Sequence, residues 1–179
     1  MIKQNKVLII VDMQNDFITG ALANPDAQKI VQPICDYIKD FDGSKIICTR
    51  DTHEDNYLLT AEGKYLPIEH CIEGTPGWCV EDNIRQTVAN TRCRITYNVI
   101  NKKTFGFENW HMYNYISRAT EIIMVGTCTD ICVISNALIL KAQVPEAKIT
   151  VLKDLCAGST PEKHEAALEV MRSCQIEVK

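Results

Sequence analysis

The sequence predicts an α/β protein: a single three-layer α/β/α domain with a six-stranded, mostly parallel, doubly wound sheet. Short apolar runs rich in β-branched residues alternate with segments of helical periodicity, which is the rhythm of repeated βαβ units. Several runs are apolar at consecutive positions, as in strands that are buried on both faces. A length of 179 residues and a hydrophobic content of 46% suit one domain with one full core. We therefore expect one domain over residues 1–179.

Six segments have the composition of short buried strands. Their β-branched residues favour extended backbone, and helical patterns separate most of them, as expected of strands that run parallel. The predicted strands are Val7–Val11, Lys45–Thr49, Arg94–Val99, Glu121–Val125, Lys148–Leu152 and Gln175–Val178.

Helical patterns occupy most of the intervening chain. Asp26–Lys39 places its isoleucines on one face, and Pro33 within it is expected to kink the helix or move its start. The last helix has Pro161 in its first turn and is capped by Ser159 or Thr160. The remaining predicted helices are Val80–Asn90, Glu108–Arg118 and Thr129–Ala142, the last apolar nearly all round and therefore buried.

One long stretch, residues 51–79, breaks this rhythm, because it holds three glycines and two prolines and no convincing helix. A loop of that length in a compact domain is usually functional. Asp12, Asp51 and Lys102 follow predicted strand ends, and residues 126–130 follow the fourth strand. Ligands of open α/β sheets bind beyond the carboxyl ends of the strands, so these connections are expected to converge on one crevice.

Composition argues against several other classes of protein. A net charge of -4 and a pI near 5.6 leave no basic footprint for nucleic acid. The first apolar run is too short to span a membrane and lacks a cleavage site, so we expect a cytoplasmic protein without membrane attachment. The nine cysteines show no Cys-x-x-Cys spacing, which disfavours zinc ribbons and thioredoxin motifs. Five of them are interpreted as small buried side chains: Cys35, Cys48, Cys93, Cys156 and Cys174.

Asp12, Lys102 and Cys132 are the candidate catalytic residues. A carboxylate, an ammonium and a thiol that meet in one cleft tune one another's pKa and can make a thiolate nucleophile. Cys132 falls in the first turn of a predicted helix that Thr129 or Asp130 could cap, so its pKa is expected to fall.

Asp51, His53 and His70 form a second constellation. A carboxylate and two imidazoles suit Zn²⁺, Fe²⁺ or Mn²⁺ with positions left open for water or substrate. Glu62, from the same long loop, is a possible additional ligand. An Asp-x-His pattern alone is short, so it is a motif match that needs structural context.

Taken together, these motifs resemble the isochorismatase-like cysteine hydrolase superfamily. The matching patterns are Val-Asp12-Met-Gln-Asn-Asp-Phe, Lys102-x-Thr-Phe-Gly and Gly126-Thr-Cys-Thr-Asp-Ile-Cys132. The resemblance implies that Asp12, Lys102 and Cys132 are catalytic. It also implies a cis peptide between Thr127 and Cys128, and an oxyanion hole made by the backbone N–H groups of Cys128 and Cys132.

The patterns Asp51-Thr-His53 and His70-Cys-Ile-Glu-Gly-Thr-Pro-Gly resemble the nicotinamidase-like branch. That resemblance implies a divalent metal, zinc or alternatively iron or manganese, which anchors the ring nitrogen of a small-molecule amide. The implied reaction converts nicotinamide to nicotinate and ammonia through a thioester. Phe17 and Trp78 are candidate aromatic walls of the pocket, and the resemblance also implies a homo-oligomer.

Two alternatives stay open at this point. One is a related amidase of the same superfamily, acting on an N-carbamoyl or maleamate-type substrate without need of a metal. The other is a non-catalytic redox or ligand sensor that uses Cys128 and Cys132. A complete set of Asp12, Lys102 and Cys132 would have no role in such a sensor.

Overall fold

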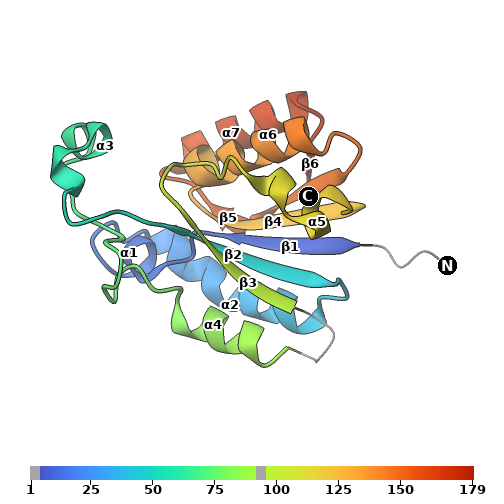
Figure 1. Cartoon of the computed structure of the whole chain (residues 1–179), viewed down its shortest axis with the longest axis horizontal. Coiled ribbons are helices and arrows are strands. Elements are labelled where there is room, and N and C mark those ends of the chain that lie inside the picture. The colour runs from blue at the N-terminus through green and yellow to red at the C-terminus, as the bar shows by residue number, and fades with distance from the viewer. Residues whose placement is uncertain (1–4, 92–95) are drawn as a thin grey trace.

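The computed structural model describes residues 5–91 and 96–179. Its six strands form one parallel sheet in the order β3-β2-β1-β4-β5-β6, which confirms the predicted doubly wound sheet (Figure 1). The strands are β1 (Lys6–Val11), β2 (Lys45–Asp51), β3 (Thr96–Lys102), β4 (Glu121–Thr127), β5 (Lys148–Ala157) and β6 (Glu177–Val178).

Helices cover both faces of the sheet. Figure 1 shows α2 and α4 on one face and α5, α6 and α7 on the other, which gives the three layers. The helices are α1 (Asn15–Ile18), α2 (Pro25–Asp40), α3 (Ala61–Tyr65), α4 (Asp82–Ala89), α5 (Asn114–Ser117), α6 (Ile134–Gln143) and α7 (Pro161–Ser173), with 3₁₀ turns η1 (Tyr57–Leu59) and η2 (Trp110–Met112) and a π-helical turn η3 (Thr129–Val133).

Strand β1 lies in the middle of the core. Its residues from Val7 to Val11 are completely buried, and alternate side chains belong to two separate clusters. Val7 and Ile9 pack with residues of α6 and α7, whereas Leu8 packs with residues of α2 and α4. Burial on both faces is the physical reason why this segment is apolar at every position.

The register of the sheet brings the predicted site residues to one edge. Asp51 and Lys102 are direct partners at the carboxyl ends of β2 and β3, and Val11 is paired with Gly126. Gly126 has φ +119, and a Cβ there would lie 2.1 Å from the carbonyl oxygen of Val11. Only glycine fits at this approach. The strand order also reverses between β1 and β4, where ligands of such sheets bind.

Several boundaries differ from the predictions. Helix α2 runs from Pro25 to Asp40 and continues through Pro33. It begins at Pro25 because the side chain of Asn24 caps it by accepting hydrogen bonds from the first-turn N–H groups. The predicted helix over 108–118 is two short turns, η2 and α5. The stretch 51–79 does contain helical turns, η1 and α3, which were not predicted. Strand β5 extends five residues beyond its predicted end, to Ala157, and β6 is shorter than predicted.

The cysteine prediction holds at most of the described positions. Cys35, Cys48 and Cys156 are buried and Cys174 is half-buried, whereas Cys93 lies outside the described residues, as do the first two residues of the predicted strand Arg94–Val99. Across residues 5–91 and 96–179, no helix has the length and apolar character needed to cross a membrane.

Candidate functional site

The structure brings Asp12, Lys102 and Cys132 together at the carboxyl edge of the sheet. The ammonium of Lys102 lies 2.7 Å from Oδ2 of Asp12 and 3.5 Å from Sγ of Cys132. All three side chains are buried, with exposed fractions of 0%, 2% and 5%. Each comes from a different strand end or the turn after it, and the predicted contact between a sulfur, an acid and an amine is present.

Asp12 is fixed by its backbone and by a partner that the sequence did not reveal. Its φ of +48 lies in the left-handed region, which Asp tolerates better than most residues. The hydroxyl of Thr49 donates to Oδ1 of Asp12 at 2.6 Å, and the N–H of Asp12 donates to that hydroxyl oxygen at 3.2 Å. Burial raises the pKa of Asp12, while Lys102 and the Thr49 hydrogen bond oppose that rise.

The pKa of Lys102 is raised although its burial acts in the opposite direction. Burial lowers the pKa of Lys102. The negative charge of Asp12 raises it, Cys132 and Asp51 raise it further, and together they outweigh the effect of burial. Lys102 is therefore an ammonium that carries one positive charge into a buried acidic site.

Cys132 lies in a π-helical turn, not in the first turn of a capped α-helix. The N–H of Val133 donates to the carbonyl of Cys128 at 3.0 Å, five residues back, and no side chain caps this turn. Asp130 instead accepts hydrogen bonds from Ser159 through N–H and hydroxyl. Thr129, the other expected cap, contacts Nδ1 of His164 at 2.8 Å.

The expected fall in the pKa of Cys132 was therefore wrong. Burial raises this pKa well above its ordinary value, the Asp12 carboxylate raises it further, and Lys102 lowers it only in part. The resting sulfur is a neutral thiol, so attack requires that a base accept its proton.

The cis peptide between Thr127 and Cys128, implied by the family resemblance, is present.

Asp51, His53, Glu62 and His70 gather into one cluster beside these residues. Each offers a ligand atom, and those atoms all lie within 4.8 Å of one another. Nε2 of His53 is 3.0 Å from Oδ2 of Asp51 and 3.8 Å from Oε1 of Glu62, and Nε2 of His70 is 3.6 Å from Oδ2 of Asp51. Nitrogen and carboxylate oxygen donors in this number suit a divalent ion such as zinc, so the residues present fit such a metal.

Neighbouring groups orient His70 and keep Asp51 negatively charged. Nδ1 of His70 bonds to the carbonyl oxygen of Ile68 at 2.8 Å, which turns Nε2 toward Asp51, as outer-shell partners do for ligand histidines. Burial raises the pKa of Asp51, but its hydrogen bonds to both histidines and the charge of Lys102 outweigh burial and lower it. Lys102 lies 3.5 Å from Oδ1 of Asp51 and so links this cluster to Asp12 and Cys132.

Gln14 fixes the end of β2, a role that was not predicted. Its side chain accepts a hydrogen bond from the N–H of Asp51 at 2.7 Å and donates to the carbonyls of Asp51 and Trp78, both at 2.9 Å. Gln14 is completely buried and lies two residues after Asp12. The signal in the sequence that could have identified this role was a glutamine shortly after the apolar run of β1.

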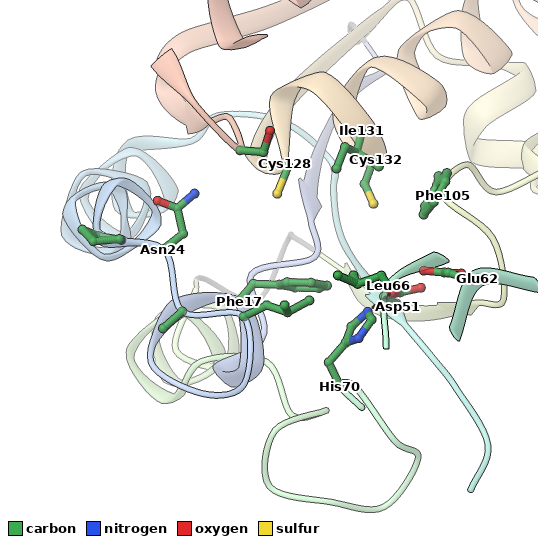
Figure 2. A pocket seen from close by; sticks show the side chains of 14 residues that line it. Phe17, Asn24, Asp51, Glu62, Leu66, His70, Phe105, Cys128, Ile131 and Cys132 are labelled. Carbon is green, nitrogen blue, oxygen red and sulfur yellow. Dashed lines mark ion pairs between the residues drawn. The ribbon is translucent and has the colours of Figure 1, made fainter. Parts of the chain in front are cut away.

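A cavity of about 340 Å³ opens between the two clusters. In Figure 2, Cys128 and Cys132 approach it from one side, while Phe17 and His70 lie across from them and Asp51 and Glu62 lie at one end. The lining residues are Phe17, Leu22, Ala23, Asn24, Pro25, Asp51, Glu62, Leu66, His70, Phe105, Cys128, Ile131, Cys132 and Ser159.

Phe17 is thus placed at the pocket, but the prediction that Trp78 forms an aromatic wall was wrong. Trp78 is not among the lining residues; its indole donates to the hydroxyl of Thr52 at 2.9 Å, and Arg50 lies 3.5 Å from its ring centroid. Phe105 and Leu66 line the pocket instead. Leu66 lies in a segment that no local pattern marked, whereas Phe105 is the phenylalanine of the Lys102-x-Thr-Phe-Gly motif and was not identified as a pocket wall.

This fold and site define a family. The model of the isochorismatase domain matches residues 6–178, and the chain belongs to that family.

Known proteins of this kind are similar to the chain along nearly its whole length. The nicotinamidase/pyrazinamidase of Mycobacterium tuberculosis is 29% identical over 187 residues, which cover 97% of this chain and 97% of that protein. The crystal structure of pyrazinamidase of Pyrococcus horikoshii in complex with zinc is 28% identical, with a TM-score of 0.79 and coverage of 98% of both chains. The structure of N-carbamoylsarcosine amidase from Thermoplasma acidophilum is 26% identical, with a TM-score of 0.76 and coverage of 98% of this chain and 96% of that one.

Proposed function

We propose that this protein hydrolyses the carboxamide of nicotinamide to nicotinate and ammonia through a thioester on Cys132. The observation that carries the proposal is the position of Lys102, whose ammonium contacts Asp12, Cys132 and Asp51 at once. Lys102 thus connects the nucleophile Cys132 and its base Asp12 to the candidate metal ligand Asp51. The similarity to nicotinamidases and pyrazinamidases supports the same reading.

The first half of the reaction forms the thioester. Asp12 accepts the proton of the Cys132 thiol while the sulfur attacks the carboxamide carbon. The backbone N–H groups of Cys128 and Cys132 bind the oxyanion of the tetrahedral intermediate, and one such donor is worth about 3–4 kcal/mol in comparable hydrolases. Asp12 returns the proton to the amide nitrogen, the carbon–nitrogen bond breaks, and ammonia leaves.

The second half restores the enzyme. Asp12 accepts a proton from a water molecule while the water oxygen attacks the thioester carbon. The carbon–sulfur bond breaks, Asp12 returns its proton to the sulfur, and the carboxylic acid product releases its own proton to solvent and leaves as nicotinate. Lys102 stabilises the negative charge that passes between Asp12 and the sulfur, because both lie within 3.5 Å of its ammonium.

Asp51, His53, Glu62 and His70 are proposed to hold the metal. When bound, a zinc, iron or manganese ion supplies a Lewis-acid position for the pyridine nitrogen of the substrate. The apolar side chains of Phe17, Leu66, Phe105 and Ile131 suit a flat ring between this end and the sulfur. A cavity of about 340 Å³ is at the small end of ligand pockets, as a single-ring substrate requires.

The test is ammonia release from a panel of primary amides by metal-replete protein. Nicotinamide and pyrazinamide should be hydrolysed, whereas benzamide, which keeps the ring but lacks its nitrogen, should be a much poorer substrate. Cys132→Ala should abolish release and Cys128→Ala should retain it. If no pyridine carboxamide is turned over, the nicotinamide proposal fails. Ammonia release that Cys132→Ala abolishes and Cys128→Ala retains would exclude the sensor alternative.

One second candidate has specific support. The similarity to an N-carbamoylsarcosine amidase extends over 98% of this chain, so hydrolysis of an N-carbamoyl or maleamate-type amide is the alternative. Such a substrate has no ring nitrogen and would not need the metal. Chelator-treated protein that hydrolyses these amides at full rate would favour this alternative.

Two further properties are proposed from the family resemblance and the sequence: association of copies of the chain into a homo-oligomer, and a cytoplasmic location. Light scattering on the purified protein measures the first, and fractionation of the source cells measures the second. A monomer at micromolar concentration would contradict the proposed assembly.

A further inference from the structure

Tyr57 lies between two parts of the site and is absent from the proposed chemistry. It is completely buried in η1, although the two residues after it, Leu58 and Leu59, are exposed. A large polar side chain buried in a short irregular segment requires a reason. The sequence pattern did not identify this tyrosine.

The ring of Tyr57 packs against both metal-ligand histidines. Its centroid lies 4.6 Å from that of His53, at an interplanar angle of 57°, and 5.0 Å from that of His70, at 77°. The two histidine rings are themselves 4.8 Å apart and nearly perpendicular. Tilted and edge-to-face contacts of this kind fix the orientation of rings, so Tyr57 forms a cluster with both histidine rings that aims the imidazoles at Asp51.

The hydroxyl of Tyr57 contacts the segment that follows α3. It donates a hydrogen bond of 2.9 Å to the carbonyl oxygen of Leu66, the residue directly after α3, which lines the pocket. Helix α3 also carries Glu62, and in Figure 2 Glu62 and Leu66 lie beside Asp51 and His70. One side chain thus touches two ligand histidines and the segment that supplies the fourth ligand and a pocket wall.

Helix α3 lies away from the layered body, as Figure 1 shows, so its contacts with η1 are the ones that place it. Its start is fixed by Thr60, whose hydroxyl donates to the carbonyl of Tyr57 and accepts from the N–H of Gly63. Gly63 lies so close to η1 that a Cβ there would be 2.1 Å from the carbonyl oxygen of Tyr57. The Thr60 hydroxyl and the close approach of Gly63 hold the first turn, and at the end the Tyr57 hydroxyl adds to the backbone hydrogen bond from Leu66 to Glu62.

We propose that Tyr57 is a positioning residue whose ring aligns His53 and His70 for the metal and whose hydroxyl fixes the Leu66 wall of the substrate pocket. The pocket half of this inference rests on the proposed function. The two roles can be tested separately, because the hydroxyl contacts the pocket wall at Leu66 and the ring contacts the metal-ligand histidines.

The test uses two substitutions and three readouts. Tyr57→Phe removes only the hydroxyl, so the KM for nicotinamide should rise about fivefold, as expected for one lost hydrogen bond, while kcat stays within about twofold. Its zinc affinity, measured by competition with a chromophoric chelator, should stay within about twofold. Trypsin cleavage after the exposed Lys64 of α3 should become about threefold faster or more, because the end of the helix is released.

Tyr57→Met removes the ring but fills the space, and its zinc affinity should fall about tenfold or more, as for other outer-shell changes. Tyr57→Leu serves the same purpose if Tyr57→Met does not fold. Tyr65→Phe is the matched control, since Tyr65 belongs to α3 but is 94% exposed, and it should leave every readout unchanged.

Unchanged KM and trypsin cleavage in Tyr57→Phe, or wild-type zinc affinity in the folded ring-free variant, would overturn the inference. If the wild-type protein releases no ammonia from nicotinamide, the proposed function fails, and the zinc and trypsin readouts still decide the role of Tyr57.

Discussion

Replacing Lys102 with methionine tests whether the buried ion pair with Asp12 organises the site. Methionine keeps most of the side-chain volume and removes the charge, which leaves a completely buried carboxylate without its cation. Breaking a buried pair on one side costs about 3–5 kcal/mol of unfolding free energy. Lys103, the neighbouring residue, pairs with Glu54 through side chains that are 71% and 59% exposed, and such a pair is worth about 0–1 kcal/mol.

The measurement is urea unfolding of metal-free wild-type, Lys102→Met and Lys103→Met protein at neutral pH. With m-values of about 1–3 kcal/mol per M, the midpoint of Lys102→Met should fall by about 1 M or more. Lys103→Met should stay close to wild type and keep its amidase activity, whereas Lys102→Met should lose activity. The double variant Asp12→Asn/Lys102→Met removes both charges and should be more stable than Lys102→Met alone. Equal stability losses in the two lysine variants would refute the reasoning.

Three further outcomes follow from the same geometry. Thr49→Val removes both hydrogen bonds to buried Asp12, so urea unfolding should show a loss of about 1.5–3 kcal/mol; unchanged stability would contradict this. Glu62→Gln should weaken zinc binding about tenfold or more in a chelator competition, and a value within about twofold of wild type would exclude Glu62 as a ligand. Because burial raises the pKa of Cys132, its alkylation by iodoacetamide, followed on the peptide that carries it, should keep rising through about pH 9. A plateau near neutral pH would mean a resting thiolate.

The residues at the ends of strands were predictable from the sequence. Asp12, Asp51 and Lys102 each follow an apolar run, and the doubly wound topology brings such ends to one edge. Lys102, the candidate catalytic lysine, is buried against Asp12, whereas the neighbouring Lys103 is exposed.

The turn that carries Cys132 was less accessible to prediction. Apolar periodicity identifies helical backbone but does not separate an α-turn from a π-turn, whose cause is the hydrogen bond from Val133 to Cys128. The error in the pKa of Cys132 arose because a helix-terminus argument ignores burial beside a carboxylate.

The pocket walls were the least predictable part of the site. Trp78 was chosen for its aromatic character, yet its ring is held by Arg50 and Thr52 outside the cavity. Leu66 and Phe105 reach the cavity through tertiary contacts of irregular segments. A single sequence carries no periodic signal for such positions.

The most direct test of the central claim is detection of the acyl group on Cys132 during turnover of nicotinamide. Rapid acid quenching followed by peptide mass spectrometry should find a nicotinoyl thioester on the peptide that contains Cys132, and Asp12→Asn should not accumulate it. Steady ammonia release with no adduct at Cys132, or undiminished release by Cys132→Ala, would contradict the account.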